Sequence, residues 1–316
     1  MGAQASPNNP FTDQVHYNFD PIATGENSGI TINIVKEMDN MTFTSITSSR
    51  DSDSFEYTDI DFDSANMLYN ETNVNLSAKS QEFRLASNNN EKFNWLLGAY
   101  FYQEDADNDS AVIFAGPAWR AYADILALGA TQGAFDMAAV GALLNVPSSL
   151  IFATGQGSTG IFTQETDTTT IFGQIDINLT EKLSAILGAS YIEDEKKATG
   201  VDVNTDVFSQ IGFVGVGTFA FIQAGFDPAT AAALASNPAT NALLGFQAFQ
   251  FLPRMQPFPN IGESGQSKDD NVDYTAKLTY LVNDNISVYG GISTGFKSSA
   301  WNLSVNSLPD AAERDA

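Results

Sequence analysis

Apolar and polar residues alternate with a period of two along several stretches of this chain. The alternation is cleanest between Gln164 and Leu179, where Ile171 and Ile175 fall on one face of an extended strand and Gln174 falls on the other. Such a pattern indicates a strand that has one apolar and one polar environment, as when one face meets lipid and the other a polar lumen.

The same pattern predicts four hairpins, each made of two strands and a short turn. The paired ranges are Gly29–Glu37 with Met41–Tyr57, Glu71–Ser87 with Phe93–Asp105, Gln164–Leu179 with Leu183–Lys196, and Asn271–Leu281 with Ile286–Ser298. Strands of roughly 9 to 16 residues are long enough to cross an outer membrane at a tilt. The hairpins together predict about eight antiparallel strands.

Long connections separate the hairpins, at about residues 58–70, 106–163 and 198–270. Short turns on one side and long loops on the other are typical of outer-membrane barrels, whose extracellular loops are the elaborate ones. We therefore predict an all-β fold: an antiparallel transmembrane β-barrel, partial, with residues 1–316 forming a single domain.

The two longest connections have helical features. Apolar residues recur at helix-like spacing in Trp119–Gly129 and Phe135–Asn145, and Asp227 and Asn237 are each followed by a proline, as at a capped helix start. The second long loop is thus expected to hold two short helices in tandem.

Aromatic residues are spaced as in the interfacial girdles of membrane barrels. The predicted girdle residues are Phe93, Trp95, Phe101, Tyr191, Tyr280, Tyr289 and Trp301. The chain has no run of about 18 apolar residues, which excludes a transmembrane helix. Residues 1–10 have no basic or apolar segment typical of a signal peptide, so we expect the chain to be a piece of a longer exported protein.

Charge and composition exclude several functions. The formal net charge is -24 with only 14 Lys and Arg, so no nucleic-acid partner is expected. Cysteine is absent, which excludes disulfides and thiolate chemistry. The single histidine, His16, stands in no pattern of a catalytic triad, and no nucleophile elbow or phosphate-binding loop occurs. We predict that the protein is not an enzyme and needs no cofactor.

Two acidic clusters stand out. Asp59, Asp61 and Asp63 alternate in the first long loop, where their oxygens are candidate ligands for a structural calcium ion, although the EF-hand pattern fails beyond them. The run Glu193–Lys197 mixes acidic and basic residues and is interpreted as a solvated strand end.

One segment near the end of the sequence, Tyr289–Asn302, reads YGGISTGFKSSAWN. Its Gly295, Phe296, Lys297, Ser298 and Asn302 resemble the mid-barrel motif of TonB-dependent outer-membrane receptors. The pieces SQEFRLAS (Ser80–Ser87) and FNWLLGAYFYQED (Phe93–Asp105) are similar to a strand pair of the same family.

This resemblance implies a receptor in the outer membrane of a Gram-negative bacterium that contacts membrane lipid. The family imports scarce small molecules, of which ferric siderophores are favoured here over cobalamin or oligosaccharides, and it is driven by the TonB complex through an N-terminal plug. Neither the plug nor the later strands match, so this piece is expected to be inactive alone. Trp119, Arg120 and Tyr122 combine stacking surface with a cation and are the candidate ligand contacts in the outer vestibule.

Two other interpretations remain open. A passive porin-like channel would share the alternation and the aromatic girdles. A soluble β-rich carbohydrate-binding or adhesive domain would instead bury its apolar strand faces in a sandwich core.

Overall fold

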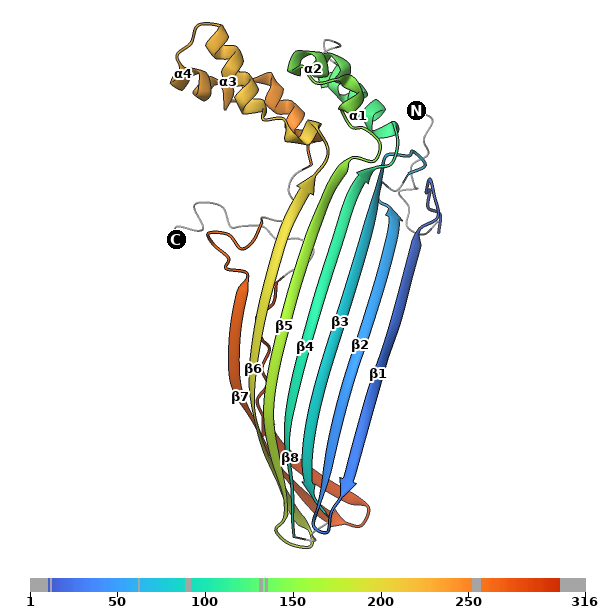
Figure 1. Cartoon of the computed structure of the whole chain (residues 1–316), viewed down its shortest axis with the longest axis vertical. Coiled ribbons are helices and arrows are strands. Elements are labelled where there is room, and N and C mark those ends of the chain that lie inside the picture. The colour runs from blue at the N-terminus through green and yellow to red at the C-terminus, as the bar shows by residue number, and fades with distance from the viewer. Residues whose placement is uncertain are drawn as a thin grey trace.

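The computed structural model describes residues 11, 13–61, 63–88, 92–130, 133, 136–251 and 257–301. These residues form one antiparallel sheet in which each strand pairs with its neighbours in sequence, from β1 to β8. The strands are β1 (Ile22–Glu37), β2 (Met41–Asp59), β3 (Leu68–Ser87), β4 (Phe93–Phe114), β5 (Gly157–Asn178), β6 (Leu183–Asn204), β7 (Gln266–Asn283) and β8 (Ile286–Ser293). Figure 1 shows them as a tall, curved wall with tight turns at one end and helices at the other.

The four predicted hairpins are confirmed as β1–β2, β3–β4, β5–β6 and β7–β8. Most strands are longer than predicted: β4 and β5 have 22 residues each, about twice the roughly 9–11 residues that cross an outer membrane. The connections are correspondingly shorter, at 60–67, 115–156 and 205–265 rather than 58–70, 106–163 and 198–270.

The additional residues of these strands were not predicted because they form no apolar face. Beyond Phe101, the same face of β4 carries Asp105, Asp107 and Asp109, and the strand still pairs with β5 there. A segment that projects beyond the hydrocarbon is wet on both faces, so it keeps its ladder of hydrogen bonds without apolar alternation. Only β8 is shorter than predicted, ending at Ser293 instead of Ser298.

One face of the sheet, the outer face, carries an apolar band that runs across all eight strands. The register aligns this band, since Trp95 lies opposite Ile175 and Ile175 lies opposite Leu187. Leu97 is 56% exposed and Leu278 is 53% exposed, so the band is not buried against protein. The band comprises Ile32, Ile34, Phe43, Phe83, Leu85, Trp95, Leu97, Ile171, Ile175, Leu187, Tyr274, Leu278 and Val288. A continuous apolar surface of this kind is stable against lipid.

The aromatic prediction is right for five residues and wrong for two. The outer face carries Phe93, Trp95, Phe101, Tyr191 and Tyr280. Tyr289 pairs with Thr279 on the opposite, inner face, where the Lys277 ammonium lies 4.5 Å from its ring centroid. Trp301 packs against a small buried cluster of Phe162, Ala198 and Phe258, so neither residue belongs to an interfacial girdle.

The charged run at the top of β6 divides between the two faces. Glu193 on the outer face lies 3.2 Å from Lys268 and is solvated as predicted. Asp194 and Lys196 face inward, are buried and form an ion pair, so the interpretation as a solvated strand end is wrong for them. Ser298, which accepts a 2.7 Å hydrogen bond from Lys196, lies 102 residues further along the chain. Burial here comes from a segment that local sequence does not reveal.

The two longest connections pack together beyond the strand ends as one helical lobe, formed by the described parts of residues 115–156 and 205–251. Its elements are α1 (Ala118–Ala130), α2 (Met137–Leu144), η2 (Ser148–Leu150), η3 (Phe208–Gln210), α3 (Phe213–Gln223), α4 (Pro228–Ala235) and η4 (Ala242–Phe249). Figure 1 places α1–α2 and α3–α4 as two helix pairs above the sheet. No helix in the described part of the chain is long and apolar enough to cross a membrane.

The predicted helices are confirmed for α1, α2 and α4, and α4 has Asp227 as its N-cap with proline in its first turn. The prediction of an α-helix that begins after Asn237 is wrong. Asn241 caps a 3-10 helix there instead, since its side chain accepts a hydrogen bond from the Leu243 amide. Helix α3 was missed because its apolar residues surround the whole helix and leave no periodic stripe.

The buried Asn241 also fixes the packing of α3. The side-chain nitrogen Nδ2 of Asn241 donates hydrogen bonds to the carbonyls of Phe213 (3.2 Å) and Ala235 (2.8 Å). A Cβ atom added to Gly217 would lie 2.5 Å from this nitrogen. Glycine at position 217 therefore lets α3 approach α4 and η4 closely, whereas Gly215 in the same helix has open space around it.

Gly217→Ala should destabilise the lobe by roughly 1–3 kcal/mol, because the added methyl displaces Asn241 and its two hydrogen bonds. Gly215→Ala, the matched control, should stabilise α3 by up to about 1 kcal/mol through helix propensity alone. Hydrogen exchange of the α3 amides measures both changes. Equal effects of the two substitutions would contradict the packing account.

Candidate functional site

The helical lobe lies at the end of the sheet opposite the tight turns (Figure 1), and loops held on a rigid scaffold are the usual place for binding residues in proteins. Its core is a row of rings that joins the two loops. Phe152 of the first loop lies 4.7 Å from Phe208 of the second, measured between ring centroids. The row continues from Phe152 to Phe114 at the end of β4 and from Phe208 to Phe213 at the start of α3.

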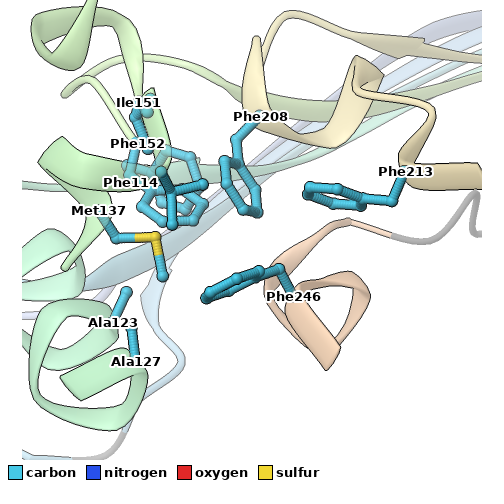
Figure 2. Packing of buried hydrophobic residues seen from close by; sticks show 10 residues of the cluster. Phe114, Ala123, Ala127, Met137, Ile151, Phe152, Phe208, Phe213 and Phe246 are labelled. Carbon is cyan, nitrogen blue, oxygen red and sulfur yellow. The ribbon is translucent and has the colours of Figure 1, made fainter. Parts of the chain in front are cut away.

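Figure 2 shows these rings together with Met137 and Phe246, which close the core from the helices. Phe114, Phe208 and Met137 are at most 1% exposed. Because residues from both loops and from a strand end share this core, the lobe is held to the sheet as one packed unit.

A buried carboxylate fixes the turn by which β6 enters the lobe. The Asp206 carboxylate accepts hydrogen bonds from the Phe208 amide (3.2 Å), the Ser209 amide (2.9 Å) and the Ser209 hydroxyl (2.5 Å). Burial raises the pKa of Asp206 above its ordinary value, opposed by these hydrogen bonds, which lower it. Asp206 thus positions the aromatic core, and sequence reasoning missed it because an Asp in a loop is ordinarily solvated.

The three predicted vestibule contacts lie together on α1. Trp119 packs against the core, with its ring 6.0 Å from Phe114 and 5.9 Å from Tyr122. Tyr122 is 38% exposed. The structure therefore brings Trp119 and Tyr122 into one aromatic surface whose outer part is open to solvent.

Arg120 has a structural role that its sequence context did not indicate. Its Nε donates to Asp124 (3.2 Å), and its guanidinium also donates to the carbonyls of Ser148 (2.8 Å) and Ile151 (3.4 Å). The side chain ties α1 to the turn that leads back to β5. Its charge and donors are already engaged by the protein, while contact of any of the three residues with a ligand stays a prediction.

The aspartates proposed for calcium lie at the end of β2 (Asp59) and in the connection to β3 (Asp61 and Asp63), and they accept backbone hydrogen bonds. Asp59, which is fully buried, accepts from the amides of Asn18 and Asp61, each at 3.1 Å. Asp61 accepts from the Leu68 amide at 2.9 Å, and Asp63 from the Ala65 amide at 2.5 Å. Burial raises the pKa of Asp61. These carboxylates brace the loop.

No group of three or more His, Cys, Asp or Glu residues that could hold a metal ion occurs in the described residues. The structure thus does not assemble Asp59, Asp61 and Asp63 into a shared site. Calcium binding at these residues remains a prediction without geometric support.

Arg120→Met should weaken the lobe by roughly 1–3 kcal/mol, because it leaves Asp124 and two carbonyls without their charged donor. The rate of limited proteolysis in residues 115–156 measures the change. Lys182→Met in the exposed β5–β6 turn is the matched control and should have no effect. Unchanged proteolysis of the Arg120 variant would refute the structural role.

Comparison with known proteins agrees with this architecture. The model of the family described as TonB dependent receptor-like, beta-barrel, matches residues 2–314. Among solved structures, the ferric yersiniabactin uptake receptor FyuA from Yersinia pestis superposes with a TM-score of 0.56 at 13% identity. The match covers 92% of this chain and 31% of that receptor, so the chain spans about a third of the length of FyuA. At this identity the likeness establishes the fold alone.

None of the curated proteins matches the chain. The family match nevertheless covers nearly the whole sequence, and the eight-stranded sheet agrees with the mid-barrel resemblance of the segments quoted above. The chain belongs to the family of TonB-dependent receptors, and it matches the family's β-barrel domain.

Proposed function

We propose that this chain forms part of the wall of an outer-membrane receptor that imports a scarce ligand by TonB-dependent active transport in a Gram-negative bacterium. The observation that carries the proposal is the division of one continuous sheet into an apolar outer face and a polar inner face. Such a sheet fits lipid on one side and a water-filled interior on the other, and family membership supplies the receptor class.

The receptor needs more strands than the described sheet has. Strands β1 and β8 do not pair with each other, and each leaves a free edge in the described residues. Unpaired backbone groups are costly in hydrocarbon, and the chain spans only 31% of FyuA. We infer that further strands complete the barrel, that a plug domain couples it to TonB, and that the chain alone does not transport.

The identity of the ligand is a separate question. FyuA takes up ferric yersiniabactin according to its description, and at 13% identity that specificity is not transferred here. An iron chelate, cobalamin and an oligosaccharide are the ligands expected from the family resemblance. Tyr122 and Trp119 are the proposed contacts, and Arg120 is less suited because Asp124 and two carbonyls engage its guanidinium.

Peptides of β5 and β6 should be recovered from purified outer membranes of cells that produce the protein at its natural level. Photo-crosslinking in the same cells should join the receptor to TonB, because active import requires that contact. Recovery of the peptides only from soluble fractions would contradict the proposal and favour a soluble adhesive domain.

The same proposal predicts that the 316-residue chain, refolded alone into liposomes, gives no arabinose-driven swelling above that of empty liposomes. In the described residues the sheet is open, since β1 and β8 do not pair with each other, and an open sheet encloses no pore. Swelling comparable to that of a general porin would instead support a passive channel.

A further inference from the structure

Two neighbouring rows of side chains border a hollow of about 520 Å³ on the outer face, across β2, β3, β4 and β5. The row nearer the turns contains Thr47, Gln81 and Phe101, and the row nearer the lobe contains Lys79, Gln103 and Asp167. Apolar residues of the outer face lie on one side of this hollow and polar residues on the other. We call it the band-edge hollow.

Lys79 is the charged group of the hollow whose donors are unused. Its side chain is exposed, and its ammonium forms no hydrogen bond or ion pair with any described residue. The other long polar side chains are engaged. Gln81 accepts a 2.5 Å hydrogen bond from Thr47, and Gln103 donates a 2.8 Å hydrogen bond to Asp167. The ammonium therefore offers three donors to a ligand, and an oxyanion is the group that matches them best.

The position of Lys79 relates it to a membrane surface. Toward the turns, the outer face carries Phe101, which is 44% exposed, and then Ile171, which is 59% exposed. A lysine at the edge of such an apolar band lays its aliphatic stem on the band and extends its ammonium to the headgroup level. Basic groups at that level bind the phosphates of lipid headgroups.

A second hollow, of about 510 Å³, lies lower in the apolar band over β4, β5 and β6. It surrounds Gly173, which has no side chain, and its apolar walls are Phe93, Trp95, Leu97, Ile175 and Leu187. Along the outer face of β4, only the small Ala99 separates Leu97 from Phe101. From Gln103 to Leu97 is roughly 20 Å along the strand, which at a tilt of about 40° is about 15 Å of depth, or one leaflet.

The charge of the protein favours a lipid over a dissolved anion. The formal net charge is -24, and Asp167 lines the same hollow as Lys79, so the field of the protein repels a free phosphate ion. A lipid is held at the sheet by its acyl chains, whose contact with the apolar band offsets this repulsion. The two hollows together thus match one amphiphile, with a phosphate above and a chain below.

We infer that the band-edge hollow binds the phosphate-bearing headgroup of a membrane lipid, with Lys79 as the phosphate contact and an acyl chain lying along β4 past Ala99. This lipid site goes beyond the proposed function, because import of a ligand does not require it. It rests on that function only for the contact of the outer face with lipid.

Acetylation of individual lysines tests the site in the receptor purified from outer membranes and delipidated in detergent. Saturating dioleoyl phosphatidic acid should slow the acetylation of Lys79 at least about tenfold, as read by peptide mass spectrometry. Dioleoylglycerol has the same chains without the phosphate and should slow it less than about twofold. Lys197 is the internal control and should react equally in all samples, since it is exposed on the same face opposite Glu165.

Three outcomes of this experiment overturn the inference. Unchanged acetylation of Lys79 in phosphatidic acid would show that no headgroup covers it. Equal protection by both lipids would show apolar cover without recognition of phosphate. Equal protection by inorganic phosphate at the same concentration would make the hollow a site for a dissolved anion instead of a lipid.

Exposed lysines provide variants that should fold normally. Lys79→Met should weaken the binding of phosphatidic acid about tenfold, which is about 1.4 kcal/mol, measured as bound lipid by native mass spectrometry. Lys79→Arg should bind nearly as well as the unchanged receptor, because guanidinium also pairs with phosphate. Lys197→Met removes the same charge and is the matched control. Equal affinities of the two methionine variants would contradict the inference.

Failure of the lipid site is distinguishable from failure of the proposed function. The lipid assays contain no TonB and use receptor that has already been recovered from outer membranes. A receptor that crosslinks to TonB but leaves Lys79 unprotected would refute the lipid site alone.

Discussion

The structure depends on one constraint, which is that every backbone N–H and C=O group at membrane depth must pair within the protein. Hydrocarbon offers no hydrogen-bond partner, so strands survive there only as neighbours in a continuous ladder. The ladder runs from β1 to β8, with each strand pairing antiparallel to the next and one register shift in the β7–β8 pair, between Leu281 and Asn283. Once pairing fixes the strands, side chains must alternate between lipid and interior, and the apolar band of the outer face follows.

The same ladder continues where the constraint no longer applies. Strands β4, β5 and β6 keep their pairing for 22 residues each, well beyond the part that lipid covers. In these end segments of β4 and β6 the outer face carries Asp105, Asp107 and Glu195, whose side chains are solvated. In the proposed receptor, this wall holds the lobe away from the membrane surface.

The lobe is stabilised in another way, by a compact apolar core rather than by a ladder. Phe114 belongs to the last residue pair of β4 and to this core at once, so the sheet and the lobe are mechanically connected. The buried caps of Asp206 and Asn241 satisfy the backbone where the chain turns into and within the lobe. Its outer surface keeps exposed apolar side chains, among them Ile125 of α1 and Phe219 of α3.

Local patterns predicted the elements whose environment is set locally. The four hairpins, the helices around Trp119 and Met137, and the Asp227 cap could be read from alternation, spacing and capping chemistry. Contacts between distant segments could not be read in this way. The burial of Asp194 and Lys196 depends on Ser298, the inward position of Tyr289 depends on strand register, and the structural use of Arg120 depends on carbonyls 28 and 31 residues away.

The sequence by itself determined the class of fold, because period-two alternation and short turns are consequences of pairing in a two-sided environment. Only the tertiary structure decided where the strands end and that the two long loops share one aromatic core. It also decided which polar side chains, such as those of Arg120 and Asn241, form hydrogen bonds within the protein. Those features depend on packing between residues far apart in the chain. A local sequence pattern does not show which distant residue each side chain contacts.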